Sequence, residues 1–275
     1  MITKDELVKD LIKFGIENKR VIVHSSLSSI GRVIGGSTTV IEALTEVCKT
    51  VMMPAFCWDS VTHPPLGDYP NNNGCNYSYY DNWDRMSKPF IIDKMGVEKS
   101  LGVIAKEFVK FPGVDRSNHS WHSWAVFGED SRNLVENHSW SDTNTPISKL
   151  LKFEDSFILM IGVTFSSCTA IHVAEEIVGR EPFIRWVIDK DGNNKRVSVS
   201  GCGNGFWKIE KPCKENIKKE LIGKSPSMLI KLDKLISCAK NAMLEYPEIT
   251  KCSDECIRCK DTIKNYERKG KNNDC

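Results

Sequence analysis

The sequence has almost no excess charge and no long apolar run. Its 38 Lys and Arg residues are opposed by 36 Asp and Glu, so a formal net charge of +2 supplies no global field for a nucleic acid. The longest apolar stretches, such as residues 157–163, fall far short of the ~18 residues typical of a membrane span. We therefore expect a protein that binds neither nucleic acid nor membrane.

The charged first segment, M-I-T-K-D-E-L-V-K-D, also lacks the apolar core of a signal peptide. This favours a soluble, cytoplasmic protein. Its eleven cysteines cannot all pair, because their number is odd, and a reducing compartment keeps cysteines as thiols. The oligomeric state stays unknown from the sequence.

The chain alternates between strand and helix patterns, as in a sheet covered by helices. An apolar run at 20–23 ends at His24, and a Ser- and Gly-rich loop follows it. Thr39 and Glu42 then have the spacing of a capping box, like Thr3 and Glu6 near the N-terminus. The same patterns recur as a helix at 101–108 and as strands at 51–53, 124–127 and 157–163. We predict one α/β domain with a mixed sheet over residues 1–250.

Three further predictions concern the C-terminal half. The Asp191-Gly192 turn lies between two strand-like runs and predicts a β-hairpin. Ser225-Pro226 predicts the start of a long helix, because proline is favoured at the first helical position. Residues 251–275 are rich in cysteine and lack periodicity, so we expect a separate, loosely attached tail.

His172 and Glu175 are a candidate catalytic pair. They lie three residues apart in a predicted helix, so they share a face, and the carboxylate can orient the imidazole and stabilise its protonated form. Pairs of this kind are also common on exposed helix surfaces. The preceding strand favours catalysis, because ligands of α/β sheets collect at the carboxyl ends of strands. His24 lies at a second such end.

The loop after His24, S-S-L-S-S-I-G-R-V-I-G-G, is a candidate phosphate-binding loop. Its backbone N–H groups, its hydroxyls and Arg32 are suitable donors, and the following helix N-terminus adds a favourable dipole. It is not a Walker A loop, since Lys-Ser/Thr does not follow the glycines. A structural turn explains this loop equally well.

Five segments resemble the aminoglycoside 3-N-acetyltransferase family. They are V-H-S-S-L-S-S-I-G-x-V-x-G-G from residue 23, M-M-P-A-F from 52, R-S-N-H-S-W-H-S-W-A-V-F-G from 116, T-P-I-S-K-L from 145 and I-G-V…T-A-I-H-V-A-E from 161. The match is co-linear over roughly residues 3–210. The resemblance implies a three-layer α/β/α sandwich distinct from the GNAT fold, with acetyl-CoA as co-substrate.

The resemblance also implies roles for individual residues. His172, supported by Glu175, is expected to be the general base that deprotonates the 3-amino group of an aminoglycoside antibiotic. The residues expected to contact CoA are His24, Ser25, Ser26, Leu27, Ser28 and Ser29. Those expected at or near the acceptor substrate are Arg116, His119 and Ser123. A covalent route through Cys168 is the less favoured alternative, because a lone buried cysteine is usually inert.

Two departures from the family bear on the acceptor. Ser120 replaces the usual proline after His119, and Ser166 stands where many members carry an aspartate. An aminoglycoside is a polycation and needs an acidic cleft, which Asp59, with Trp58 as a stacking face, could help to form. Further candidates in the long polar and aromatic segment 58–94 are Asp68, Asp81, Asp84 and Trp83. Solvated loop carboxylates are the equally good alternative.

The tail motif C-S-D-E-C-I-R-C supplies Cys252, Cys256 and Cys259 at a spacing that can hold a soft metal. Cys238 and Cys275 are the candidates for a fourth ligand. Neither lies at short spacing, so we assign no metal from the sequence. Three functions stay open: an aminoglycoside acetyltransferase, a family member that acylates a different amine metabolite, and a non-catalytic metal-binding protein. The His172–Glu175 pair disfavours the third.

Overall fold

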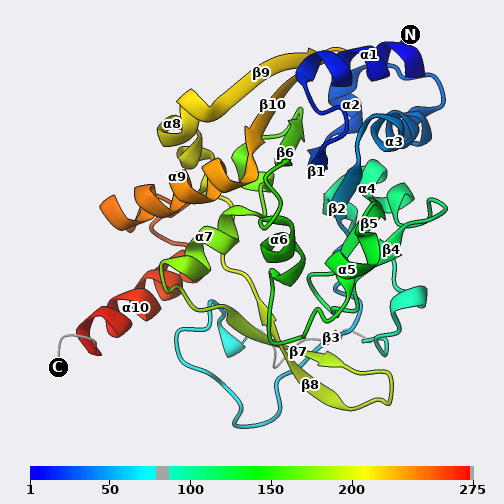
Figure 1. The fold of residues 1–275 in the computed structure, drawn as a ribbon. Helices are drawn as coiled ribbons and strands as arrows, with labels where there is room; N and C mark the ends of the chain where they lie inside the picture. Colours follow the sequence, from blue (N-terminus) through cyan, green and yellow to red (C-terminus); the bar gives the residue numbers. More distant parts are fainter. Residues whose placement is uncertain (79–86, 273–275) are drawn as a thin grey trace.

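A seven-stranded mixed sheet forms the centre of the protein (Figure 1). The computed structural model describes residues 1–78 and 87–272. The strand order is β4-β5-β2-β1-β6-β10-β9, and β1 (Arg20–Ser25) pairs in parallel with β2 (Thr50–Pro54) and β6 (Ser156–Ile161). The flanking strands are antiparallel to their neighbours: β4 (Asp115–Arg116), β5 (Trp124–Gly128), β9 (Ile217–Ile222) and β10 (Ser225–Lys231). The predicted mixed sheet is confirmed.

Helices cover both faces of this sheet, because alternate residues of each central strand point to opposite sides. Ile22 and Met52 pack into one apolar layer, and Val21 and Val51 pack into the other. The first layer includes α5 (Ser131–Val135), α6 (Thr145–Leu150), α7 (Ile171–Ile177), α8 (Glu210–Cys213) and α9 (Leu232–Glu245). The second includes α1 (Lys4–Phe14), α2 (Leu27–Ile30), α3 (Gly36–Val47) and α4 (Gly102–Phe108). This is the predicted three-layer α/β/α sandwich.

The two predicted capping boxes have different outcomes. At α1, Thr3 Oγ1 accepts the Glu6 N–H at 3.3 Å, and Glu6 Oε2 accepts the Thr3 N–H at 2.8 Å, which confirms the first box. The second box is wrong, because α3 begins at Gly36 and so contains Thr39 and Glu42. Gly35 adopts a left-handed conformation with φ 79°, which glycine tolerates, and this turns the chain into the helix earlier than predicted.

A smaller sheet lies beyond the carboxyl ends of the parallel strands (Figure 1). It contains β3 (Val61–Thr62), β7 (Phe183–Ile188) and β8 (Asn194–Val199) in the order β3-β7-β8. The last two strands form the predicted hairpin. Short 3-10 helices of the described chain include Ile92–Lys94, Lys99–Leu101, Phe165–Ser167, Phe206–Ile209 and Lys214–Asn216.

The C-terminal region departs from the prediction at two points. Residues from Ser225 form strand β10 between β6 and β9, and α9 begins only at Leu232. The strand accommodates Pro226, whose carbonyl accepts the Gly162 N–H at 3.1 Å. The tail is not loosely attached, since it contains α10 (Ile257–Asn272) with Cys259 buried. Among the described residues we find no helix with the length and apolarity needed to cross a membrane.

Candidate active site

A cleft of about 560 Å³ opens at the carboxyl ends of the parallel strands. Residues at or just after the ends of β1, β2 and β6 line it: Val23, His24, Ser25, Met53, Pro54 and Val163. The smaller sheet supplies a further wall through Val61, Arg185 and Val199. The cleft therefore lies where the topology of an α/β sheet is expected to form a binding site.

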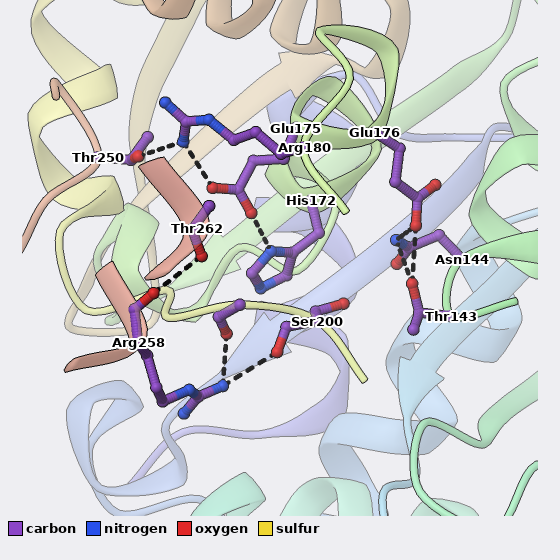
Figure 2. Close-up of polar contacts among 11 residues, drawn as sticks. Thr143, Asn144, His172, Glu175, Glu176, Arg180, Ser200, Thr250, Arg258 and Thr262 are labelled. Carbon is purple, nitrogen blue, oxygen red and sulfur yellow. Dashed lines mark hydrogen bonds and ion pairs between the residues drawn. The ribbon is translucent and has the colours of Figure 1, made fainter. Parts of the chain in front are cut away.

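His172 lines this cleft from the first turn of α7, and Glu175 lies one turn further on. His172 Nδ1 lies 2.6 Å from Glu175 Oε2, and Glu175 Oε1 accepts a hydrogen bond from Arg180 Nη1 at 2.8 Å (Figure 2). The His172 ring also packs against Phe206, with 4.7 Å between ring centroids. The structure thus brings the predicted pair together and adds a cation behind it.

The electrostatics of this row fix which nitrogen of His172 carries a proton. Burial by itself raises the pKa of the Glu175 carboxyl, but hydrogen bonds and charge from His172 and Arg180 hold that pKa below its ordinary value. An ionised carboxylate only accepts hydrogen bonds, so Nδ1 of His172 donates. In the neutral imidazole the lone pair is then on Nε2, as a general base requires.

Arg180 is a component of the site that the sequence did not predict. Its side chain is 3% exposed. It also donates from Nη1 to Thr250 Oγ1 at 2.6 Å and from Nη2 to the Pro247 carbonyl. These contacts, together with the carboxylate, hold the guanidinium behind Glu175. Spacing within α7 gives no sign of this arrangement, because Thr250 lies far along the chain.

Two more histidines line the cleft, and both are buried. Burial lowers the pKa of His24 to about 4. Burial, followed by the nearby His119, lowers the pKa of His122 well below its ordinary value. Both imidazoles are therefore neutral near pH 7. His122, which packs against Phe56 at 4.8 Å between ring centroids, was not a predicted site residue.

Of the loop residues predicted to contact CoA, His24 and Ser25 line the cleft. The others are Ser26, Leu27, Ser28 and Ser29, which form the short helix α2 and its N-cap beside the cleft. Ser29 Oγ donates to the Ser26 carbonyl at 2.7 Å and lies 2.9 Å from Ser225 Oγ. The second contact anchors this loop to β10.

Arg116, His119 and Ser123 support the cleft wall from behind. Arg116 donates to the carbonyls of Met95 at 2.7 Å and Gly96 at 3.0 Å, and to Ser123 Oγ at 3.1 Å. His119 Nδ1 accepts the N–H of His122 at 2.9 Å and that of Trp121 at 3.1 Å. Trp121 and His122 line the cleft, whereas the three supporting residues are not among its described lining residues.

The carboxylates predicted to make the cleft acidic lie elsewhere or outside the described residues. Asp59 pairs with Lys88 at 3.6 Å, and Asp68 accepts hydrogen bonds from Arg196 and from Trp186 Nε1. Trp58 does line the cleft, 5.9 Å from Trp121 between ring centroids. The remaining candidates, Asp81, Asp84 and Trp83, lie outside the described residues.

The described lining residues in fact include Arg185 and Arg258 but no Asp or Glu. Ser166 also lines the cleft, and its Oγ donates to the Asn204 carbonyl at 3.1 Å. Cys168 is not among these lining residues. Burial raises the pKa of this thiol to about 12, so the covalent alternative through Cys168 has neither an accessible nor an ionised nucleophile.

Fold and site define an α/β/α protein with a histidine–carboxylate pair at the carboxyl edge of its sheet. The family model for aminoglycoside 3-N-acetyltransferase matches residues 22–244, and the chain belongs to this family, as its sequence motifs predicted. The SPbeta prophage-derived aminoglycoside N(3')-acetyltransferase-like protein YokD of Bacillus subtilis is 31% identical over 183 residues, 63% of this chain and 64% of YokD. Aminoglycoside N(3)-acetyltransferase VIII of Streptomyces fradiae is 27% identical over 63% of this chain and 60% of that protein.

The chain thus spans less than two thirds of the length of these curated relatives. Solved structures share its fold more completely. The crystal structure of YokD has a TM-score of 0.77 at 24% identity, covering 89% of this chain and 100% of that one. Aminoglycoside acetyltransferase AAC(3)-IVa has a TM-score of 0.76 at 21% identity, covering 96% and 97%. AAC-IIIb, solved as a binary complex with CoASH, has a TM-score of 0.72 at 19% identity, covering 89% and 97%.

Proposed function

We propose that this protein is an acetyl-CoA-dependent N-acetyltransferase in which His172 is the general base. The observation that carries this proposal is the row His172–Glu175–Arg180 at a cleft, in a chain of this family. An aliphatic amine is mostly protonated at neutral pH, and only its neutral form attacks a thioester. A base must therefore accept a proton as the C–N bond forms, and a histidine is suited to this near pH 7.

In this mechanism the acceptor nitrogen attacks the thioester carbonyl while His172 Nε2 takes its proton. Glu175 then stabilises the imidazolium, as it lies 2.6 Å from Nδ1. Collapse of the tetrahedral intermediate breaks the C–S bond, and the proton passes to the CoA thiolate. The products are an amide and CoA. Arg180 keeps Glu175 ionised, so its role is to position and charge the carboxylate.

The part of the cleft around His24 supports acetyl-CoA as the co-substrate that donates the acetyl group. His24 Nε2 is buried, has no hydrogen-bond partner among the residues that the structure describes, and belongs to a residue that lines the cleft. An unpaired buried polar atom is costly, so a ligand contact there would be favourable. The structural relative AAC-IIIb was solved with CoASH. We extend the donor site to the predicted loop residues from Ser25 to Ser29.

The general base is tested by His172→Ala, with CoA release from acetyl-CoA as the assay. We expect kcat to fall by about 10²- to 10⁴-fold, the usual contribution of general base catalysis, while acetyl-CoA binding by calorimetry is retained. A variant as fast as the wild type would remove His172 as the base. Wild-type protein that binds acetyl-CoA but acetylates no amine would overturn the activity itself.

For the acceptor we propose the 3-amino group of an aminoglycoside, so that the protein would confer antibiotic resistance. The curated relatives are named for this reaction. Structural relatives were solved with a gentamicin, with sisomicin and with apramycin. These names and complexes support an aminoglycoside as the first acceptor to test.

The charge of the cleft favours a second candidate, an amine with fewer positive charges. Among the described residues the lining carries two arginines and no carboxylate, and Ser166 stands where the family resemblance implies an aspartate. A polycation gains little electrostatic stabilisation from a cleft wall with this charge. The competing acceptors are separated by kcat/KM for gentamicin, apramycin and sisomicin against glucosamine and glucosamine 6-phosphate.

Ser166→Asp is the matched variant for this comparison. If an aminoglycoside is the acceptor, the added carboxylate should raise kcat/KM for gentamicin. Higher kcat/KM for glucosamine 6-phosphate in the wild type, with a further loss in Ser166→Asp, would support the second candidate instead.

A further inference from the structure

Four cysteines from distant parts of the chain meet beside the active site. Cys202 follows β8, Cys252 and Cys256 lie in the segment before α10, and Cys259 lies in the first turn of α10. Their Sγ atoms all lie within 4.8 Å of one another, and each is a free thiol. The sequence motif supplied three of them. The fourth is Cys202 rather than the predicted Cys238, while Cys275 lies outside the described residues.

The spacing of the sulfurs matches a single tetrahedral ion. Zn–S bonds of ~2.3 Å in a tetrahedron set neighbouring sulfurs ~3.8 Å apart. Cys202 Sγ lies 3.8 Å from Cys252 Sγ, which lies 3.6 Å from Cys259 Sγ. These distances are far longer than a disulfide bond of ~2.05 Å. An iron–sulfur cluster, which lies between its cysteines, would need the sulfurs farther apart.

The surroundings of the sulfurs also suit thiolates. Cys202 and Cys259 are buried, and Cys252 and Cys256 are half-buried. The Cys252 N–H points at Cys259 Sγ at 3.5 Å. Cys256 and Cys259 flank the first turn of the long helix α10, where the helix dipole stabilises negative charge. Four sulfur ligands leave no open position, which is typical of a structural zinc site.

We propose that Cys202, Cys252, Cys256 and Cys259 bind one Zn²⁺ ion, and that this ion fastens α10 to the active site. The ion would cross-link the loop after β8 to the segment between α9 and α10. That segment, residues 246–256, contains no helix or strand of its own. A tetrathiolate cross-link would therefore supply order that hydrogen-bonded secondary structure does not.

The helix that the ion would hold contacts the site directly. Arg258 Nη2 donates to the carbonyls of Ser200 at 3.0 Å and Gly201 at 2.5 Å, and both of these residues line the cleft. Figure 2 shows Arg258 and Thr262 beside His172 and Glu175.

Helix α10 also contacts the polar loop at residues 72–74. Asp261 Oδ2 accepts the Gly74 N–H at 2.9 Å, and Asn265 Nδ2 donates to the Asn72 carbonyl at 3.1 Å. The ion would thus hold the cleft wall at 200–201 and the loop at 72–74 through a single helix.

Metal content is the first test. Protein purified without chelators should contain about one zinc per chain by elemental analysis. Cys202→Ser and Cys256→Ser should lose it, and the matched control Cys238→Ser should keep it. Co²⁺ added to the reduced, zinc-free wild type should give the intense visible absorption of a tetrahedral tetrathiolate site. Because this titration uses the wild type, it tests the metal site even if a cysteine variant does not fold.

Wild-type protein that contains no zinc and binds neither Zn²⁺ nor Co²⁺ after reduction of its thiols would overturn the site. So would zinc that survives in Cys202→Ser but is lost in Cys238→Ser, or iron in place of zinc in the purified protein.

Limited proteolysis tests the structural role. Removal of the metal with a strong chelator under reducing conditions should expose the peptide bond after Lys251 to trypsin and lower the unfolding temperature, and added Zn²⁺ should reverse both. An unchanged cleavage pattern and unfolding temperature would overturn the fastening role. None of these measurements depends on acetyl transfer, so failure of the zinc site and failure of the proposed function can be distinguished.

Discussion

Two neighbouring carboxylates of α7 differ in pKa because their partners differ in charge. Burial raises the pKa of both Glu175 and Glu176. The hydrogen bond from His172 and the charge and hydrogen bond of Arg180 reverse this effect for Glu175, whose pKa is lowered. Among the described residues, Glu176 Oε1 accepts hydrogen bonds from two neutral donors, Thr143 Oγ1 and Asn144 Nδ2, each at 2.7 Å (Figure 2), and its pKa stays raised. The carboxylate with the lowered pKa is the one that faces the imidazole.

Replacing each carboxylate in turn by its amide shows whether its negative charge or only its hydrogen bonds are needed. Glu175→Gln leaves the buried guanidinium of Arg180 without its counter-charge, so we expect the free energy of unfolding to fall by about 3–5 kcal/mol, together with kcat. Glu176→Gln changes only neutral contacts and should cost about 0.5–1.5 kcal/mol. Urea unfolding and the CoA-release assay measure the two effects. Equal losses in both variants would contradict this assignment.

The sequence predicts those parts of the site that rest on local spacing. His172 and Glu175 are three residues apart, so the periodicity of one helix was enough to pair them. Thr250 and Cys202 come close to the pair through contacts between distant segments, which no spacing rule reports. Arg180 lies just past the end of α7, where helical spacing no longer predicts which side chains meet.

Local sequence patterns have the same limit when they are used to predict helices and strands. The central strands are buried on both faces and appear in the sequence as short apolar runs, which is why their positions were predicted correctly. Strand β10 was predicted as a helix because Ser225-Pro226 resembles a helix start. Its conformation is set by pairing with β6 and β9, which a local pattern cannot reveal.

The loop after β8 approaches the segment after α9 so closely that a side chain is excluded. A Cβ atom on Gly205 would lie 2.2 Å from the Thr250 carbonyl oxygen. We expect Gly205→Ala to push these segments apart and to lower the free energy of unfolding by about 1–3 kcal/mol, the usual cost of overpacking. Gly96→Ala is the control, because nothing lies within 4 Å of its Cβ position. Chemical unfolding of both variants measures the difference, and a stability of Gly205→Ala equal to that of Gly96→Ala would refute the contact.

At the scale of the whole molecule, four buried histidines link stability to pH. Burial is the main cause in each case: it lowers the pKa of His24 and His138 to about 4, that of His119 to about 2, and that of His122 well below its ordinary value. An unfolded histidine takes up its proton near pH 6.5. Between that pH and about 4 the unfolded chain therefore binds more protons than the folded one, and stability falls as the pH falls.

We accordingly expect a steep loss of stability between pH 6.5 and 5, by up to about 1.4 kcal/mol per pH unit for each fully neutral histidine. The raised pKa of Glu176 acts in the opposite sense, because the folded protein then takes up a proton before the unfolded chain does, but it offsets at most one of the four. Carboxylates with lowered pKa values, such as Glu175, lose their stabilising effect only below about pH 4.3, outside this window.

Unfolding in urea at several pH values between 5 and 7.5 tests this expectation, with His138→Gln as the diagnostic variant. Its imidazole contacts Ser117 Oγ at 3.0 Å, a hydrogen bond that an amide can replace. On unfolding between pH 6.5 and 5, the variant should take up about one proton fewer than the wild type. Its free energy of unfolding should therefore fall less steeply with falling pH, even if the variant is less stable at pH 7.5. A wild-type stability that is flat across the window would show that the buried histidines become protonated without unfolding.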